Sequence, residues 1–161
     1  MEQYKNIFGS MRNKQMLMRI SFGIIFFWFG ALKFFPSVSP AEELASETIY
    51  RLTFGIFSKH TGLILLAILE CGLGLMFLSG KYTKATILTA IGHMLCTFTP
   101  FFLLPEASFT QAPYAFTLVG QYIMKNIVFI VALTMMWPEA QTGVIRQQKN
   151  IKRIMHEDVA V

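Results

Sequence analysis

Charged residues are scarce in this chain: Asp, Glu, Lys and Arg make up 14% of its 161 residues, whereas 54% are hydrophobic. A soluble domain of this length needs more charge to cover its surface in water. Cysteine is also rare, and two copies exclude a secreted scaffold held by disulfides. Cys71 and Cys96 both lie in apolar blocks. They are either small hydrophobic residues of the interior or a redox pair. The long apolar blocks predict a bilayer as the solvent.

Motifs that hold phosphate, metal or haem are missing as well. The sequence has no glycine-rich phosphate loop, no paired-cysteine metal motif, no haem attachment motif and no nucleophile elbow. His60, His93 and His156 are far apart in the sequence, and nothing pairs them as metal ligands. We therefore expect no metal site. The net charge of +5 lies in loops and tails, which favours contact with anionic lipid over nucleic acid.

Four apolar blocks each have a length close to the roughly 20 residues that a helix needs to cross a hydrocarbon core. The blocks are Leu17–Pro36, Thr61–Gly80, Ala85–Leu104 and Phe116–Trp137. The sequence thus predicts an all-α fold, a single domain over residues 1–161 built as a bundle of four transmembrane helices. The turn Lys81–Lys84 is so short that spans two and three must be antiparallel neighbours. Pro100 should kink span three, and the carbonyl that it frees needs a partner from another helix.

Basic residues gather in three segments: the N-terminal segment, the turn between spans two and three, and the C-terminal tail 138–161. The other two loops are acidic or poor in basic residues. Under the positive-inside rule, this asymmetry places both termini in the cytoplasm. Short loops and the same bias suit the inner membrane of a bacterium.

The first outer loop is predicted to contain a short amphipathic helix. Ser39–Glu43 combines a capping serine, a proline in the first turn and carboxylates near the positive end of the helix dipole. The helix would lie on the outer surface, either as a plain surface element or folded over the mouth of the bundle. Residues 2–14 and 146–156 are candidates for interfacial helices on the cytoplasmic side.

Ionisable residues inside the spans are the strongest functional signal. Lys33, Glu70, His93 and Lys125 lie on four different spans, in the outer half or the middle of the membrane. A charge at the bilayer centre costs roughly 2.5–3.5 kcal/mol on the insertion scale, so charged side chains that face only lipid are disfavoured. We therefore expect an inward-facing cluster in which Glu70 bridges Lys33 and Lys125, with His93 as a neutral partner or proton acceptor. Lys33 carries less weight because its stem could reach the outer headgroups.

Span four adds further polar groups, because Gln121, Tyr122, Lys125 and Asn126 share one helical face. Three interpretations of the cluster stay open. It is a network that locks the helices together, a site for an anionic or quinone-like ligand, or a proton or ion path through the carboxylate and the imidazole. An anionic ligand follows from the positive charge that remains when one carboxylate faces two lysines.

Several motifs carry a family resemblance through their order and spacing. They are Arg19 at the start of span one, Trp28–Phe34, Leu69–Gly74, Thr99-Pro100, Pro105-Glu106 and Gly120–Asn126. Together they resemble the DoxX-like membrane proteins, especially the branch related to RclC, the reactive-chlorine resistance protein. The similarity covers about Met18 to Met136. That branch commonly has an acidic residue where this chain has Asn126, and its first outer loop is longer.

The resemblance implies a four-helix bundle in a bacterial inner membrane. Relatives include subunits of thiosulfate:quinone oxidoreductase, proteins linked to oxidant resistance, and chaperones or cargo receptors for membrane proteins. We therefore expect a quinone- or redox-linked subunit that handles oxidants or sulfur compounds, with Lys33, Glu70 and Lys125 binding an anion or a quinone headgroup. The alternatives are a noncatalytic partner that stabilises another envelope protein and a small proton- or anion-coupled transporter. A protein partner or a homo-oligomer is expected, and catalysis by the isolated chain stays open.

Overall fold

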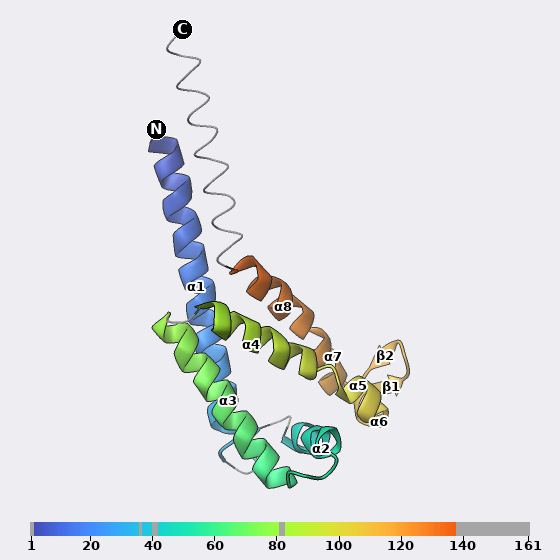
Figure 1. Ribbon diagram of the computed structural model, residues 1–161. Coiled ribbons are helices and arrows are strands. Elements are labelled where there is room, and N and C mark those ends of the chain that lie inside the picture. Colours follow the sequence, from blue (N-terminus) through green and yellow to red (C-terminus); the bar gives the residue numbers. More distant parts are fainter. Residues whose placement is uncertain (1, 36, 40–41, 81–82, 138–161) are drawn as a thin grey trace.

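A computed structural model describes residues 2–35, 37–39, 42–80 and 83–137 (Figure 1). In chain order the elements are α1 (Glu2–Leu32), α2 (Glu42–Leu52), α3 (Lys59–Ser79), α4 (Thr83–Cys96), α5 (Pro100–Leu103), α6 (Pro105–Ser108), β1 (Phe109–Gln111), β2 (Ala115–Phe116), α7 (Leu118–Met124) and α8 (Asn126–Met135). The basic tail 138–161, including the helix predicted over residues 146–156, lies outside the described residues.

Four helical segments are long and apolar enough to cross a membrane. They are Asn13–Leu32, Lys59–Ser79, Lys84–Leu103 and Leu118–Met135. The predicted helical fold with four candidate spans is therefore confirmed, and this is the architecture of a multi-pass membrane protein. The first span lies nearer the N-terminus than predicted, because α1 is one continuous helix that ends at Leu32 and not at Pro36. Beyond Leu32 the backbone tightens into turns and reaches a positive φ of 62° at Ser37.

Glycines bring the backbones of α1 and α3 into close contact. A Cβ atom added to Gly74 would lie 2.5 Å from the backbone nitrogen of Phe27, and one added to Gly30 would lie 2.7 Å from that of Cys71. Because α1 residue numbers rise as their α3 partners' numbers fall, the two helices are antiparallel, as Figure 1 shows. Small residues at such contacts let membrane helices associate through backbone packing. The tight α1–α3 pair fixes which side chains of the two helices can meet.

An aromatic core fills the space between α1, α3, α4 and α8. Its buried members are Phe22, Phe26, Leu73, Phe77, Ile87, Ala90, Met94, Leu133 and Met136. The ring centroid of Phe22 lies 5.6 Å from that of Phe77 and 5.5 Å from that of Phe129. These ring contacts join α1 to both α3 and α8.

The third span breaks near Pro100, as predicted, with α4 ending at Cys96 and α5 beginning at Pro100. The partner of the freed carbonyl differs from the prediction. Thr99 donates to the Cys96 oxygen through its backbone nitrogen at 3.1 Å and through Oγ1 at 2.7 Å. The hydrogen bond to this carbonyl, predicted to come from another helix, therefore comes from a threonine of the same segment.

A helix is present in the first outer loop, where the sequence predicts one. α2 packs against the first turns of α3, with Ile49 beside Gly62 (Figure 1). The Glu47 carboxylate lies 2.8 Å from Arg51 Nε and 2.6 Å from Lys59 Nζ, and both cations lower the pKa of Glu47. Arg51 also donates to the Leu103 carbonyl at 2.9 Å. α2 thus links the start of α3 to the end of α5.

The fourth span consists of α7 and α8, with a turn at Lys125 between them. A short antiparallel hairpin precedes it, with Phe109 of β1 opposite Phe116 of β2. The rings of these two residues lie 5.0 Å apart and pack on Phe101. The hairpin was not predicted, because strands of three and two residues are too short to show an alternating pattern.

Candidate functional site

Three of the predicted ionisable residues meet between α1, α3 and α4. Lys33 Nζ lies 2.5 Å from Glu70 Oε2, and His93 Nε2 lies 3.2 Å from Glu70 Oε1. The three side chains are 7–9% exposed. We call this group the Lys33–Glu70–His93 cluster. Its central carboxylate contacts one nitrogen group from the turn that follows α1 and one from α4.

Close packing of α1 on α3 explains why Lys33 reaches Glu70. Glu70 shares the buried face of α3 with Ala67 and Gly74, and a Cβ atom on Gly30 would lie 2.9 Å from Glu70 Cβ. The backbone of α1 therefore runs directly beside Glu70, and Lys33 follows Gly30 by three residues. Lys33 Nζ also lies 3.3 Å from the Phe29 carbonyl oxygen, to which it donates. Lys33 therefore meets Glu70 as predicted, and its ammonium group is held inside by a carboxylate and a carbonyl instead of reaching the outer headgroups.

His93 stands between the polar cluster and the aromatic core. Its ring centroid lies 5.9 Å from that of Phe26, while Nε2 faces Glu70. When a neutral His93 directs its Nε2 proton to the carboxylate, Nδ1 is left as a hydrogen-bond acceptor. The imidazole is thus in position to exchange a proton with Glu70.

Lys125 does not join the cluster, so the prediction that Glu70 bridges two lysines is wrong for this residue. The Lys125 side chain is exposed, and its Nζ lies 4.7 Å from the centroid of the Tyr122 ring. The next residue faces inward instead: Asn126 Nδ2 donates to Thr97 Oγ1 at 2.8 Å. One residue corresponds to about 100° of helical rotation, so the choice between Lys125 and Asn126 depends on a rotation that periodicity alone does not fix.

The predicted polar face of span four is therefore divided. Gln121, Tyr122 and Lys125 are exposed, whereas Asn126 joins α8 to the third span. Without Lys125, the cluster holds one carboxylate, one ammonium group and one imidazole. The surplus of positive charge that favoured an anionic ligand is gone, and a ligand without net charge fits the arrangement better.

Both cysteines are free thiols, and they occupy different environments. Cys71 is half-buried and its Sγ donates to the Phe27 carbonyl at 3.7 Å, whereas Cys96 is exposed. The thiol of Cys71 thus takes part in the α1–α3 contact. Within the described residues, no group of three His, Cys, Asp or Glu side chains is placed to hold a metal ion.

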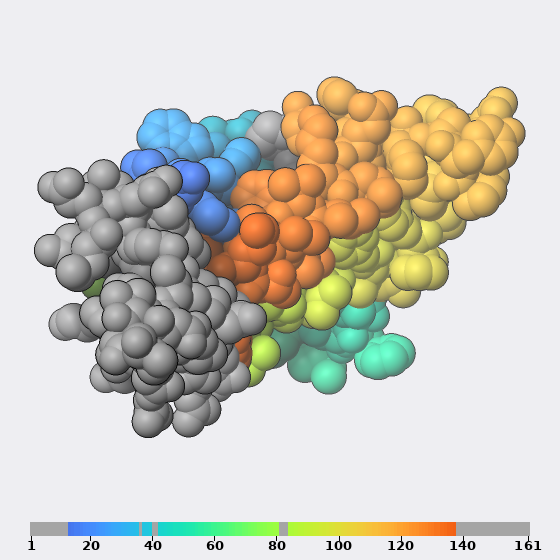
Figure 2. All heavy atoms as spheres, turned by 90° about the horizontal axis from the view of Figure 1, so that it is seen from above, coloured from blue at the N-terminus to red at the C-terminus, as the bar shows by residue number. Residues whose placement is uncertain are grey.

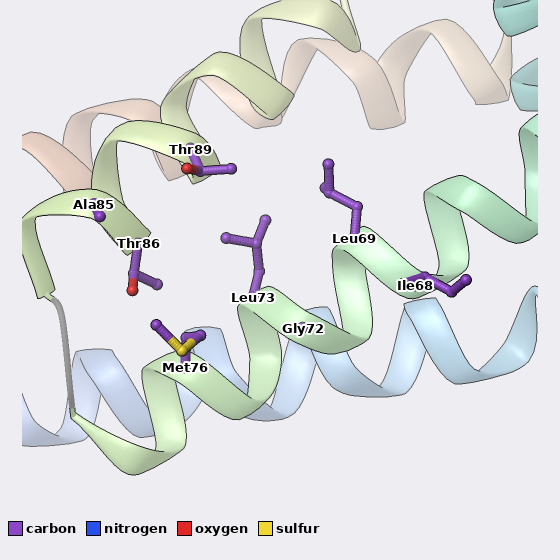
Figure 3. A pocket seen from close by; sticks show the side chains of 8 residues that line it. All are labelled: Ile68, Leu69, Gly72, Leu73, Met76, Ala85, Thr86 and Thr89. Carbon is purple, nitrogen blue, oxygen red and sulfur yellow. The ribbon is translucent and has the colours of Figure 1, made fainter.

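An apolar groove of about 260 Å³ lies between α3 and α4. Its lining residues are Ile68, Leu69, Gly72, Leu73, Met76, Ala85, Thr86 and Thr89. Figure 3 shows Leu69, Leu73 and Met76 extending from α3 toward α4. Gly72 keeps the groove open, since a Cβ atom there would meet nothing within 4 Å. Sequence reasoning missed this groove, and the glycine two residues after Glu70 was its one visible signal.

No protein-family model matches the chain, and searches of the curated proteins and of the solved structures find no match either. The resemblance to DoxX-like proteins therefore stays a prediction. Function has to be argued from the geometry of the site.

Proposed function

We propose that this protein is a small DoxX-like subunit of a bacterial inner membrane that binds a quinone headgroup at the Lys33–Glu70–His93 cluster. The proposal is carried by one observation: the buried carboxylate of Glu70, inside a candidate span, contacts the ammonium group of Lys33, one residue beyond the end of the first span, and the imidazole of His93 in the third span. Ionisable groups are costly within a bilayer, so they mark functional sites by default. Groups that donate hydrogen bonds and exchange protons suit a quinone, whose carbonyl oxygens accept hydrogen bonds and take up protons on reduction.

The hydrogen-bonding capacity of the cluster supports a carbonyl ligand. An ammonium group has three N–H donors, and Lys33 directs its donors to Glu70 Oε2 and to the Phe29 oxygen. A third N–H is thus left for a ligand oxygen. His93 and Glu70 exchange protons in this scheme, while a protein partner in the redox chain supplies electrons. The charge balance of the cluster also favours a neutral headgroup over an anion.

The apolar groove supports an amphiphilic ligand with a hydrocarbon tail. Leu69 precedes Glu70 in α3, and Thr89 lies about one helical turn from His93 in α4. The groove and the cluster therefore occupy neighbouring stretches of the same two helices. A lipid-soluble quinone combines a polar ring with an isoprenoid chain, and this proposal places the ring at the cluster and the chain along the groove.

Quinone that co-purifies with the protein tests this proposal. The protein is extracted in mild detergent, and ultraviolet absorbance is recorded before and after borohydride reduction. We expect bound quinone in the wild type and in the exposed-residue control Glu106→Gln, and its loss in Glu70→Gln and in the groove-filling variant Gly72→Phe. Helical content is checked by circular dichroism, so that loss of ligand is separated from loss of fold. Absence of quinone from the wild type, or equal amounts in all variants, contradicts the proposal.

A noncatalytic partner that stabilises another envelope protein is the second candidate. The observation that favours it is the internal balance of the cluster, in which Glu70 already contacts both Lys33 and His93. Such a network locks three helices together without any ligand. Purification of a stoichiometric protein partner without quinone supports this candidate.

A further inference from the structure

The outward face of the fourth span carries a lysine at membrane depth. Gln121, Tyr122 and Lys125 are all exposed, and all lie within the candidate span Leu118–Met135. Figure 2 shows the atoms of α7 and α8 (orange) on the surface of the molecule. We call these three residues the Lys125 face.

The charge of Lys125 is only partly compensated within the described part of the chain. Its ammonium group lies over the Tyr122 ring, in a cation–π contact that is weak at an exposed site. A lysine at the centre of a membrane helix carries an insertion cost several times larger. The contact with Tyr122 is therefore smaller than the cost of leaving the ammonium group in hydrocarbon, and an anionic group has to make up the difference.

We propose that the Lys125 face binds a transmembrane helix of a different protein, and that this helix presents an Asp or Glu side chain to Lys125. Charge complementarity selects the partner: an ammonium group in a medium of low dielectric constant is best paired by a carboxylate. Gln121 adds a side-chain amide that donates and accepts hydrogen bonds across a helix interface. This proposal is independent of quinone binding, because it concerns the outward side of a different helix.

A second copy of this chain lacks the required acid. Glu70 is the one Asp or Glu in the four candidate spans, and it lies buried against Lys33 and His93. A symmetric dimer through this face would bring lysine toward lysine, which is repulsive. The composition of the spans therefore points to a heteromeric partner.

Photocrosslinking in native membranes tests the assignment. A benzophenone amino acid replaces Val128, an exposed residue about one helical turn from Lys125, and adducts are identified by mass spectrometry. We expect an adduct with a transmembrane segment that contains Asp or Glu. Its yield should fall about tenfold in Lys125→Gln, as the loss of roughly 1.4 kcal/mol of binding energy predicts. The same yield should be unchanged in Lys14→Gln, an exposed lysine on another helix.

A charge swap completes the test. Lys125→Glu, combined with a lysine in place of the partner's carboxylate, should restore the adduct that Lys125→Glu alone abolishes. Adducts with phospholipid alone would show that Lys125 reaches a headgroup phosphate and would overturn the proposal. The proposal is also overturned if the adduct forms with a second copy of the chain or with a segment that lacks Asp and Glu. It is overturned as well if the adduct yield does not change when residue 125 is substituted.

Discussion

Glu70 is the residue on which the other two members of the cluster depend. Lys33 and His93 both direct nitrogen atoms to its carboxylate, at 2.5 and 3.2 Å. Removing one partner of a buried ion pair leaves the other charge uncompensated, which destabilises a protein by about 3–5 kcal/mol. We expect Glu70→Gln to lower the free energy of unfolding by that order, as measured by denaturation in mixed detergent micelles. Glu106→Gln, at an exposed position, should have little effect, and equal effects of both variants would argue against a polar core.

A paired replacement separates the cost of breaking the ion pair from the value of having it. We expect Lys33→Met alone to be strongly destabilising, since Glu70 keeps its buried charge. The double variant Lys33→Met/Glu70→Leu should recover most of the loss, because apolar residues often replace a buried pair with a change near zero. The same unfolding assay applies. A double variant as unstable as the sum of the single variants would show that the pair is worth more than its desolvation.

Asn126 offers a milder test of the inter-helix contacts. Its side chain donates to Thr97 on the third span at 2.8 Å, whereas Gln121 is exposed. Hydrogen bonds between membrane helices average about 0.6 kcal/mol in double-mutant cycles, with a maximum near 1.7. We expect Asn126→Leu to lose stability within that range and Gln121→Leu to lose none. A larger loss from Gln121→Leu would mean that the outward assignment of that residue is wrong.

At the scale of residues, the predicted contact between Lys33 and Glu70 is confirmed, whereas the predicted contact between Lys125 and Glu70 is wrong. Hydropathy finds a charged residue in an apolar block without showing which way its side chain points. Lys33 carried less weight in the prediction because its stem could reach the headgroups, yet Gly30 brings α1 against Glu70 and the ammonium group is held inside. Lys125 seemed too deep to leave, yet the turn between α7 and α8 points it outward and Asn126 inward. Helix rotation and pairing are tertiary facts that a single sequence leaves open.

Among the elements, α1 and α3 form the pair with the most restrictive contact. A methyl group at position 74 would lie 2.5 Å from the Phe27 backbone, whereas one at position 72 would meet nothing within 4 Å. We expect Gly74→Ala to destabilise the protein by roughly 1–3 kcal/mol through overpacking. Gly72→Ala, on the same helix, should be neutral or stabilising by up to about 1 kcal/mol, because alanine is the better helix former. Thermal unfolding in detergent compares the two, and equal effects would show that the backbones are further apart than described.

The attachment of α2 to α3 should weaken at acidic pH. The cations of Lys59 and Arg51 hold the pKa of Glu47 below its usual range. A depressed carboxylate pKa stabilises the folded state at pH values above the unfolded pKa, and this contribution is lost as the pH falls through the folded-state pKa. We expect proteolysis within α2 to accelerate over that acidic range in the wild type. Glu47→Gln should be cleaved faster at neutral pH and should show little further change in acid.

Element boundaries show where sequence patterns suffice. Blocks of about 20 apolar residues predict the four candidate spans, because length and hydropathy are properties of the segment itself. The β1–β2 hairpin depends on tertiary contacts, and the continuity of α1 depends on the absence of a helix-breaking residue. Neither feature produces a clear pattern in the sequence. The break of the third span at Pro100 was predicted. The partner of the Cys96 carbonyl was not, since the neighbouring Thr99 donates the hydrogen bonds to it.

For the whole molecule, the distribution of basic residues predicts that both termini face the cytoplasm. Residues Thr53–Phe57 would then lie on the opposite side of the membrane from Lys14. Cysteine introduced at Ser58 should react with a membrane-impermeant maleimide added to intact cells, while cysteine at Lys14 should react only after permeabilisation. The background from Cys71 and Cys96 is removed by replacing both with alanine. The reverse labelling pattern would invert the topology and place the tails outside.

The antiparallel contact between α1 and α3 has a consequence for how the chain enters the bilayer. A nascent chain delivers Lys33 first, one residue beyond the first candidate span, where an unpaired lysine makes that end of the span harder to bury. The next membrane helix brings Glu70, so we expect the two charges to neutralise each other within a single helical hairpin before α4 enters the membrane. We expect the translocon to release these two spans together, with the imidazole of His93 arriving later to a pair that has already formed.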